Sequence, residues 1–305
     1  MHAELNQIVE TAGEILLGKT HVIKLAVSCL LARGHLLIED LPGVGKTTLA
    51  HTLAHLLGLN YQRIQFTSDL LPADILGVSI FQQEEQRFQF HPGPVFAQLV
   101  LADEINRATP KAQSALLEAM EEHQVTADGK THGLPEPFFV IATQNPLHQI
   151  GTFPLPESQL DRFLMRIHIG YPERAAERNL LTGEDRRTML LRLPATMTPE
   201  QLIKLQRQVN RVHVADALLD YCQDILGHTR HSPDYQHGLS PRAGLAILQS
   251  AKAWALIEGR PQVLPEDLQA ILPATIGHRL QPAGEIIGEG GSGLVDRLIE
   301  AVPIP

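Results

Sequence analysis

The 305 residues are 44 % hydrophobic and 19 % charged, with 25 basic and 34 acidic side chains and a net charge of -9 when histidine is neutral. This composition is ordinary for a globular protein, and the length allows one large domain or two unequal ones. The acidic balance disfavours a general nucleic-acid binder, which needs a basic footprint, and no stretch approaches the roughly 20 apolar residues of a membrane span.

Residues 1–170 alternate short apolar runs with helical periodicity, which is typical of a parallel sheet with crossover helices. Five runs bounded by polar or turn residues are predicted strands: 35–39, 61–66, 98–102, 138–142 and 163–167. One helix is predicted from Thr47 to Gly58 and another from Pro110 through Glu122. We therefore predict an α/β domain over residues 1–170, helices before the first strand included.

Two segments within this domain alternate like antiparallel strands. The first pairs residues 78–81 with 87–90 across a Gln-Gln-Glu-Glu tip, and the second, 124–132, turns at Asp128-Gly129. Both are predicted to be inserted hairpins that project from the domain, and simple surface hairpins without a function fit the sequence equally well.

After Tyr171-Pro172 the pattern becomes helical. Residues 171–195 are predicted to be a linker and residues 196–305 an all-α domain. Helix starts are indicated at Thr198, Ser240 and Leu264, each followed by proline in the first turn.

A phosphate-binding loop is predicted between the first strand and the helix that follows it. The residues Pro42-Gly43-Val44-Gly45-Lys46-Thr47-Thr48 match the end of the pattern G-x-x-x-x-G-K-[ST], although Asp40 occupies the position of its first glycine. Backbone amides at the helix start would cradle phosphate, Lys46 would reach the terminal phosphates, and the Thr47 hydroxyl would be a ligand of Mg²⁺. The predicted ligand is therefore ATP with Mg²⁺.

Polar residues end two of the other predicted strands. Asp103 follows a buried strand and is predicted to hold Mg²⁺ through water, and the adjacent Glu104 to polarise the water that attacks the γ-phosphate. Asn145 follows the strand 138–142, where it could orient that water, or it could simply be a turn residue before Pro146.

Histidines and cysteines indicate no metal or disulfide chemistry. His51 and His55 lie one helical turn apart without the glutamate or third ligand of a zinc site. Cys29 and Cys222 fall in apolar helical patterns, and the amino-terminal residues lack the features of a signal peptide, so we expect a cytoplasmic protein.

These motifs, in this order, resemble the AAA+ ATPases and most closely their MoxR family. The segments that carry the resemblance are Glu39–Thr47, Ala102–Ala108, Ser114–Met120, Leu134–Pro146, Phe153–Glu157, Leu160–Phe163 and Ser240–Ala243. The resemblance implies a P-loop AAA+ domain followed by an all-α lid domain. It also identifies Asn145 as sensor 1, Arg162 as an arginine finger offered to a neighbouring subunit, and Arg242 as sensor 2 acting in its own subunit, with Arg107 as a further interface residue.

The resemblance further implies an ATPase that assembles as a homo-hexamer, remodels client proteins and works beside a partner with a von Willebrand factor A domain. The two predicted hairpins resemble the helix-2 insert and the pre-sensor-1 hairpin of one AAA+ clade, in which they face the central pore of a hexameric ring. A nucleotide-dependent binding module without significant turnover remains an alternative, as does a nucleic-acid motor, which the acidic balance and the acidic hairpin tip disfavour.

Overall fold

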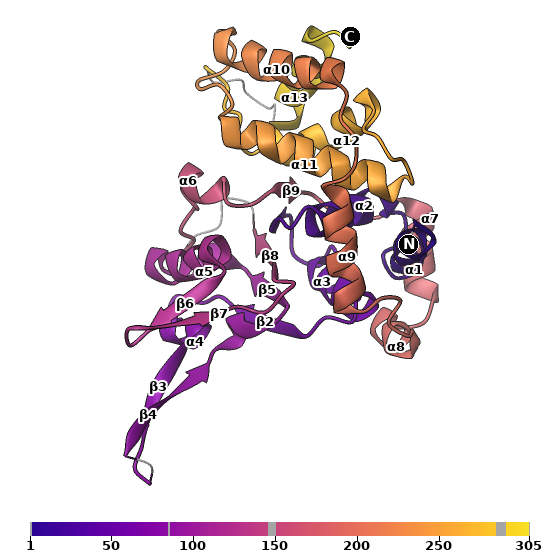
Figure 1. Ribbon diagram of the computed structural model, residues 1–305. Coiled ribbons are helices and arrows are strands. Elements are labelled where there is room, and N and C mark those ends of the chain that lie inside the picture. Colours follow the sequence, from indigo (N-terminus) through magenta and orange to yellow (C-terminus); the bar gives the residue numbers. More distant parts are fainter. Residues whose placement is uncertain (1, 85, 146–150, 285–290, 305) are drawn as a thin grey trace.

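The structure is a computed structural model that describes residues 2–84, 86–145, 151–284 and 291–304 (Figure 1). Its centre is a parallel sheet of five strands in the order β2-β5-β8-β1-β9. The strands are β1 (Leu36–Glu39), β2 (Tyr61–Gln65), β5 (Leu99–Asp103), β8 (Phe139–Gln144) and β9 (Met165–Ile167). All five predicted strands are confirmed, with ends displaced by one or two residues.

Both faces of strands β1, β5 and β8 are buried, which explains their continuous apolar runs. Along β5, Leu99 and Leu101 pack in one hydrophobic cluster, while Val100 and Ala102 pack in the other on the opposite face. Helices α1 (His2–Ile15), α2 (Thr20–Leu31) and α3 (Lys46–Leu56) contribute to the first cluster, and α4 (Pro72–Leu76) and α5 (Pro110–Glu122) to the second.

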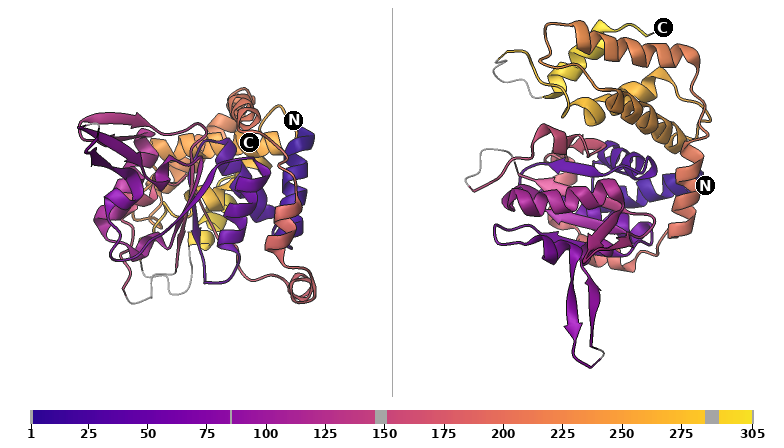
Figure 2. Two further views of the ribbon diagram at one scale, coloured as in Figure 1. Left: turned by 90° about the horizontal axis from the view of Figure 1, so that it is seen from below. Right: turned by 60° about the vertical axis from the view of Figure 1, so that its left-hand side comes forward.

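The two predicted hairpins are confirmed. Strands β3 (Gly77–Gln82) and β4 (Arg87–Pro92) form one, and β6 (Gln124–Ala127) and β7 (Lys130–Gly133) form the other. Asp128 and Gly129 both have positive φ, at 51° and 74°, as the predicted two-residue turn requires. The β3–β4 hairpin extends well beyond the body of the molecule (Figure 2).

The base of the longer hairpin requires two glycines. A Cβ on Gly77 would lie 2.3 Å from the His91 carbonyl oxygen, and one on Gly93 would lie 2.3 Å from the Ile75 carbonyl oxygen. The two chains leaving the hairpin therefore approach each other more closely than any larger residue allows.

The rest of the described chain is largely helical. Its longer helices are α9 (Pro199–Val209), α10 (Asp216–His231), α11 (Pro241–Ile257), α12 (Pro265–Ile276) and α13 (Gly291–Ala301). The Thr198 and Ser240 hydroxyls accept hydrogen bonds from the first turns of α9 and α11, as N-caps do. Helix α11 packs on α2, and α12 packs on β9, so the helical part is attached to the edge of the sheet.

Shorter helices connect these parts: α6 (Glu157–Leu160), α7 (Arg174–Thr182) and α8 (Arg186–Arg192), with 3₁₀ turns η1 (Pro94–Phe96) and η2 (Ile105–Arg107). The segment 171–195, predicted to be a linker, thus carries two helices. Among the helices of the described ranges, none is long and apolar enough to cross a membrane.

Candidate nucleotide site

The loop between β1 and α3 has the backbone of a phosphate-binding turn. Gly43 and Gly45 have φ of 86° and 102°, a left-handed region that side chains with a Cβ avoid. Helix α3 starts at Lys46 with Gly45 as its N-cap, and no side chain caps the turn. Its first amide groups are therefore left for an anion.

Lys46 is the buried cation of this loop, with an exposed fraction of 8 %. Its Nζ donates to the Asp40 carbonyl oxygen at 2.6 Å and to Asn145 Oδ1 at 3.1 Å. Burial lowers the pKa of Lys46, and the carboxylates of Asp40, Asp103 and Glu104 oppose that change. The ammonium group thus donates to two oxygen atoms, and the oxygens of a bound phosphate could take their place.

Asp103 and Glu104 lie at the carboxyl end of β5, beside Lys46. Asp103 Oδ1 accepts from the Thr143 hydroxyl at 2.6 Å, and the Glu104 amide donates to that same hydroxyl oxygen at 2.9 Å. Glu104 has φ of 56°, so the chain turns sharply here and presents the two carboxylates at different angles.

Asn145 connects the lysine to the second carboxylate. Its Oδ1 accepts from Lys46, and its Nδ2 donates to Glu104 Oε1 at 3.2 Å. Asn106 Nδ2 in turn donates to the Asn145 carbonyl oxygen at 3.1 Å, which fixes the backbone at this position. The structure therefore brings together Lys46, Asp103, Glu104 and Asn145 at the carboxyl ends of β1, β5 and β8, where parallel sheets place ligand-binding groups.

Two residues of β2 that were not predicted from the sequence also belong to this cluster. Arg63 donates to Asp103 Oδ2 through Nη2 at 2.6 Å and Nε at 3.1 Å, and Gln65 Nε2 donates to Glu104 Oε2 at 3.0 Å. They are two residues apart, so they lie on the same side of a strand whose register places Gln65 opposite Asp103. The alternation of Arg63 and Gln65 around the buried Ile64 indicates only that they share a face, because their contacts depend on which strand lies beside β2.

Asp40, the departure from the glycine pattern, has a structural role. Its Oδ2 accepts from the amides of Ile169 and Gly170 at 2.7 and 2.6 Å, and its Oδ1 accepts from the Leu41 amide at 2.8 Å. The carboxylate thus joins the start of the phosphate loop to the chain leaving β9.

Cavities of about 420 and 310 Å³ flank the start of α3. Gly43, Val44 and Gly45 line the larger one, Thr47 the smaller one, and Thr48 both. The segment predicted to be a linker contributes to both cavities through Arg186, whose buried Nε has no hydrogen-bond partner among the described residues. Leu16 and Tyr171 add apolar surface to the larger cavity, which has room for the base of a nucleotide.

Arg162 and Arg242 line a different cavity, one that contains no residue of the phosphate loop among its described lining residues. Arg162 Nη2 is 3.0 Å from Glu121 Oε2, and Arg242 Nη2 is 3.6 Å from Glu121 Oε1, in this cavity of about 320 Å³. Arg242, expected to act on the nucleotide of its own subunit, lies in the first turn of α11 and lines the same cavity as Arg162.

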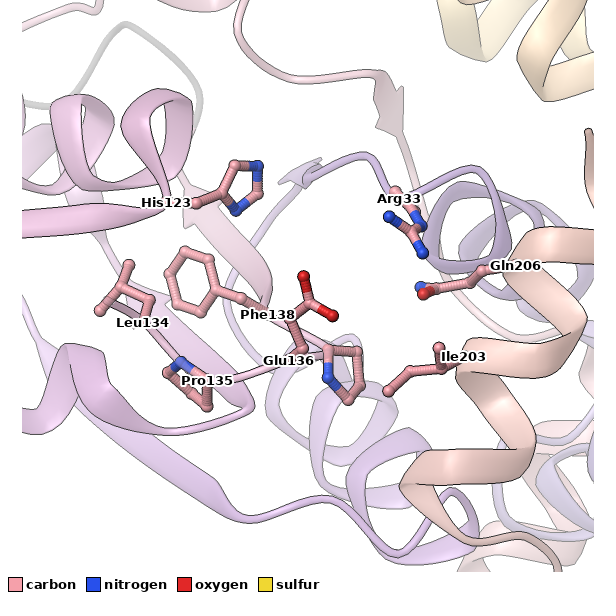
Figure 3. A pocket seen from close by; sticks show the side chains of 9 residues that line it. Arg33, His123, Leu134, Pro135, Glu136, Phe138, Ile203 and Gln206 are labelled. Atoms are coloured by element: carbon pink, nitrogen blue, oxygen red, sulfur yellow. The ribbon is translucent and has the colours of Figure 1, made fainter.

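A further cavity of about 250 Å³ lies near the amino end of β8, away from the phosphate loop (Figure 3). Arg33 and Gln206 stand on one side of it and His123 and Leu134 on the other. It contains none of the predicted site residues, and open parallel sheets bind ligands at the opposite ends of their strands.

Family models and relatives match this architecture. Residues 35–165 match the model of the ATPase family associated with various cellular activities (AAA), and residues 227–296 match the AAA lid domain. The chain is 44 % identical to the uncharacterized protein YeaC of Bacillus subtilis, over 100 % of this chain and 96 % of that one. It is 36 % identical to Chaperone MoxR1 of Mycobacterium tuberculosis, over 99 % and 82 % of the two chains.

A solved structure has the same fold. The crystal structure of a putative ATPase from Cytophaga hutchinsonii superposes with a TM-score of 0.88 at 32 % identity, covering 100 % of this chain and 96 % of that one. The similarity therefore extends through the hairpins and the helical part as well as the sheet.

Proposed function

Because this chain belongs to the MoxR family of AAA+ ATPases, we propose that it binds ATP with Mg²⁺ and hydrolyses it to ADP and phosphate. One observation carries the proposal: Lys46, Asn145 and Glu104 form a continuous hydrogen-bonded chain directly beside the phosphate loop.

The residues present fit the proposed ligands. The amides from Gly43 to Thr48 and the ammonium of Lys46 would bind the phosphates. The Thr47 hydroxyl and Asp103, the latter through water, supply the oxygen donors that Mg²⁺ prefers. When bound, Mg²⁺ would neutralise charge on the phosphate oxygens.

Glu104 is the residue we propose to activate water. Its Oε1 is held by Asn145 and its Oε2 by Gln65 and Arg107, the last at 3.0 Å. These donors orient the carboxylate, so that it can accept a hydrogen bond from the attacking water. Asn145 would sense the γ-phosphate through the amide that also contacts Lys46.

We further propose that Arg162 and Arg242 act together on the nucleotide of a neighbouring subunit. Both guanidinium groups lie on one face, around Glu121, and the phosphate loop lies elsewhere on the molecule. A planar cation that neutralises the transferred phosphoryl group is worth a factor of about 10³–10⁵ in turnover. A head-to-tail contact that repeats this arrangement closes into a ring, for which the family implies six subunits.

ATP turnover in such a ring would drive remodelling of client proteins in the cytoplasm. The name of the relative Chaperone MoxR1 supports this role, and a partner with a von Willebrand factor A domain is implied by the family alone. The β3–β4 hairpin exposes Ile80 and Phe88, and the latter has an exposed fraction of 68 %, so it offers apolar contacts to a client.

The variant Glu104→Gln tests the hydrolytic role. We expect it to bind a fluorescent ATP analogue within about threefold of wild type and to lose at least about 100-fold in phosphate release, since general-base catalysis contributes 10²–10⁴. The exposed Glu118 on α5 provides a matched control, because Glu118→Gln makes the same chemical change outside the site.

Two results would contradict this proposal. Unchanged hydrolysis in Glu104→Gln would remove the water-activating role. A wild-type protein that binds ATP without releasing phosphate, at concentrations where it self-associates, would favour the binding module.

A further inference from the structure

The segment that carries Arg162 is fixed from the helical part by one side chain. Arg279, two residues beyond the Gly277 C-cap of α12, donates from Nε to Asp161 Oδ1 at 2.7 Å and from Nη2 to the carbonyl oxygens of Asp161 and Phe163 at 3.2 and 2.9 Å. Its Nη1 donates to the Leu164 carbonyl oxygen at 3.3 Å. The guanidinium therefore contacts the backbone on both sides of Arg162.

The same guanidinium also holds the end of α12, because Nη1 donates to the Thr275 carbonyl oxygen. Such a bond satisfies a carbonyl that the helix leaves without a partner. One buried cation, with 7 % of its side chain exposed, thus links the end of a lid helix to the residues around Arg162.

Neighbouring residues strengthen this link. His278 Nε2 donates to the Phe163 carbonyl oxygen at 3.1 Å, and Arg166 Nη2 donates to the Gly277 carbonyl oxygen at 3.1 Å. We call residues 277–279 with residues 161–166 the clasp.

The Arg162 side chain has much weaker support. Its pair with Glu121 is partly exposed, at 29 % and 38 % of the two side chains, and pairs of that kind contribute about 0–1 kcal/mol. The position of the Arg162 side chain therefore depends mainly on its backbone, which the clasp holds.

We infer that Arg279 is a positioning residue for Arg162: through the clasp, the placement of α12 in one subunit sets where Arg162 is presented to the next. This inference rests on the proposed function, in which Arg162 acts in a neighbour's site. A displacement of the helical part would move the Asp161–Leu164 backbone with it, so the lid of one subunit would control hydrolysis in another.

The variant Arg279→Lys separates positioning from folding. Lysine keeps a cation beside Asp161 but cannot form the forked set of bonds to Asp161, Phe163 and Thr275 together. We expect nucleotide affinity and self-association within about twofold of wild type, with turnover reduced at least about tenfold because the finger contributes 10³–10⁵.

Arg260 offers a matched control within the helical part. It pairs with the fully buried Asp267, so Arg260→Lys makes the same change at a buried ion pair, outside the clasp. Turnover of this variant should stay within about twofold of wild type. An Arg279→Lys protein that hydrolyses ATP as fast as Arg260→Lys would overturn the inference.

Mixed rings distinguish this inference from the proposed function. Glu104→Gln subunits keep the clasp but cannot hydrolyse, whereas Arg279→Lys subunits keep the water-activating carboxylate. When the two variants are mixed in equal amounts, turnover should recover to at most about a quarter of the wild-type value. In random head-to-tail assembly, about half of the sites carry Glu104, and about half of those sites face a neighbour with an intact Arg279. A variant that is merely unstable would give no such gain.

The pair Arg162→Ala with Glu104→Gln is the reference mixture. If turnover recovers in the reference mixture but not in the mixture with Arg279→Lys, the role of Arg279 is overturned, whereas the proposed action of Arg162 in a neighbouring site is supported. Failure of both mixtures would refute the action of Arg162 in a neighbour's site. If Arg279→Lys does not assemble, Asp161→Asn is the alternative variant, because it removes the carboxylate that Arg279 binds. If Asp161→Asn mixed with Glu104→Gln does not recover turnover while the reference mixture does, the inference is likewise overturned.

Discussion

At the scale of the residue, Asp40 illustrates how a departure from a motif can be compensated. The glycine of the general pattern gives the chain conformational freedom, whereas Asp40 uses both carboxylate oxygens to hold three backbone amides. The turn itself depends on Gly43 and Gly45 further along the loop. The carboxylate therefore adds rigidity at the point where the phosphate loop meets the chain after β9.

Replacing Asp40 with alanine should destabilise the protein by about 2–4 kcal/mol, because the amides of Ile169 and Gly170 lose a charged acceptor. Urea unfolding measures the change. Asp40→Gly restores the general pattern but should be no more stable than Asp40→Ala. If either variant matched wild type, the carboxylate would not be the link that we describe.

At the scale of the element, His35 joins strand β8 to helix α5. Its Nδ1 accepts from the Val140 amide at 3.0 Å, so Nε2 carries the proton and donates to the Met120 carbonyl oxygen at 3.2 Å. The bond from the Val140 amide requires an unprotonated Nδ1 and therefore a neutral ring, and burial lowers the pKa of His35 to about 4. Acid must therefore disrupt this junction or unfold the chain around it.

The pKa of His35 is lower in the folded chain than its ordinary value of 6.5, so the unfolded chain binds more protons between these values. Stability that is present near pH 7 is lost as the pH falls toward 4, and His35 alone accounts for about 2 kcal/mol between pH 7 and 5. Urea unfolding at both pH values should show a pH dependence smaller by about that amount in His35→Gln. Equal pH dependence in the two proteins would contradict the buried neutral ring.

The sequence predicted the elements whose signal is local. Strands β1, β5 and β8 are apolar runs, and helix α5 is set by Thr109 and Pro110 at its start. Although the pattern after Tyr171-Pro172 is helical, residues 171–195 were predicted to be a linker; helices α7 and α8 in this segment line the two cavities beside the start of α3. The contact of Arg63 with Asp103 was missed as well, because it depends on which strand lies beside β5.

At the scale of the whole molecule, the arrangement of the helical part decides how the site is completed. Lys46, Asp103 and Glu104 could be grouped from their strands alone, since the carboxyl ends of parallel strands meet at one edge. The position of Arg242 could not, because it depends on how α11 packs against α2. That packing places two arginines on a face away from the loop they are proposed to serve, so the proposed site is divided between two subunits.

Specific activity as a function of protein concentration tests this division most directly. Phosphate release per subunit should rise steeply with concentration, in parallel with self-association measured by sedimentation, and then reach a plateau. Arg162→Ala should associate equally well and stay at the low level throughout. A dilute monomer that hydrolyses ATP at the plateau rate would contradict a site completed by a neighbouring subunit.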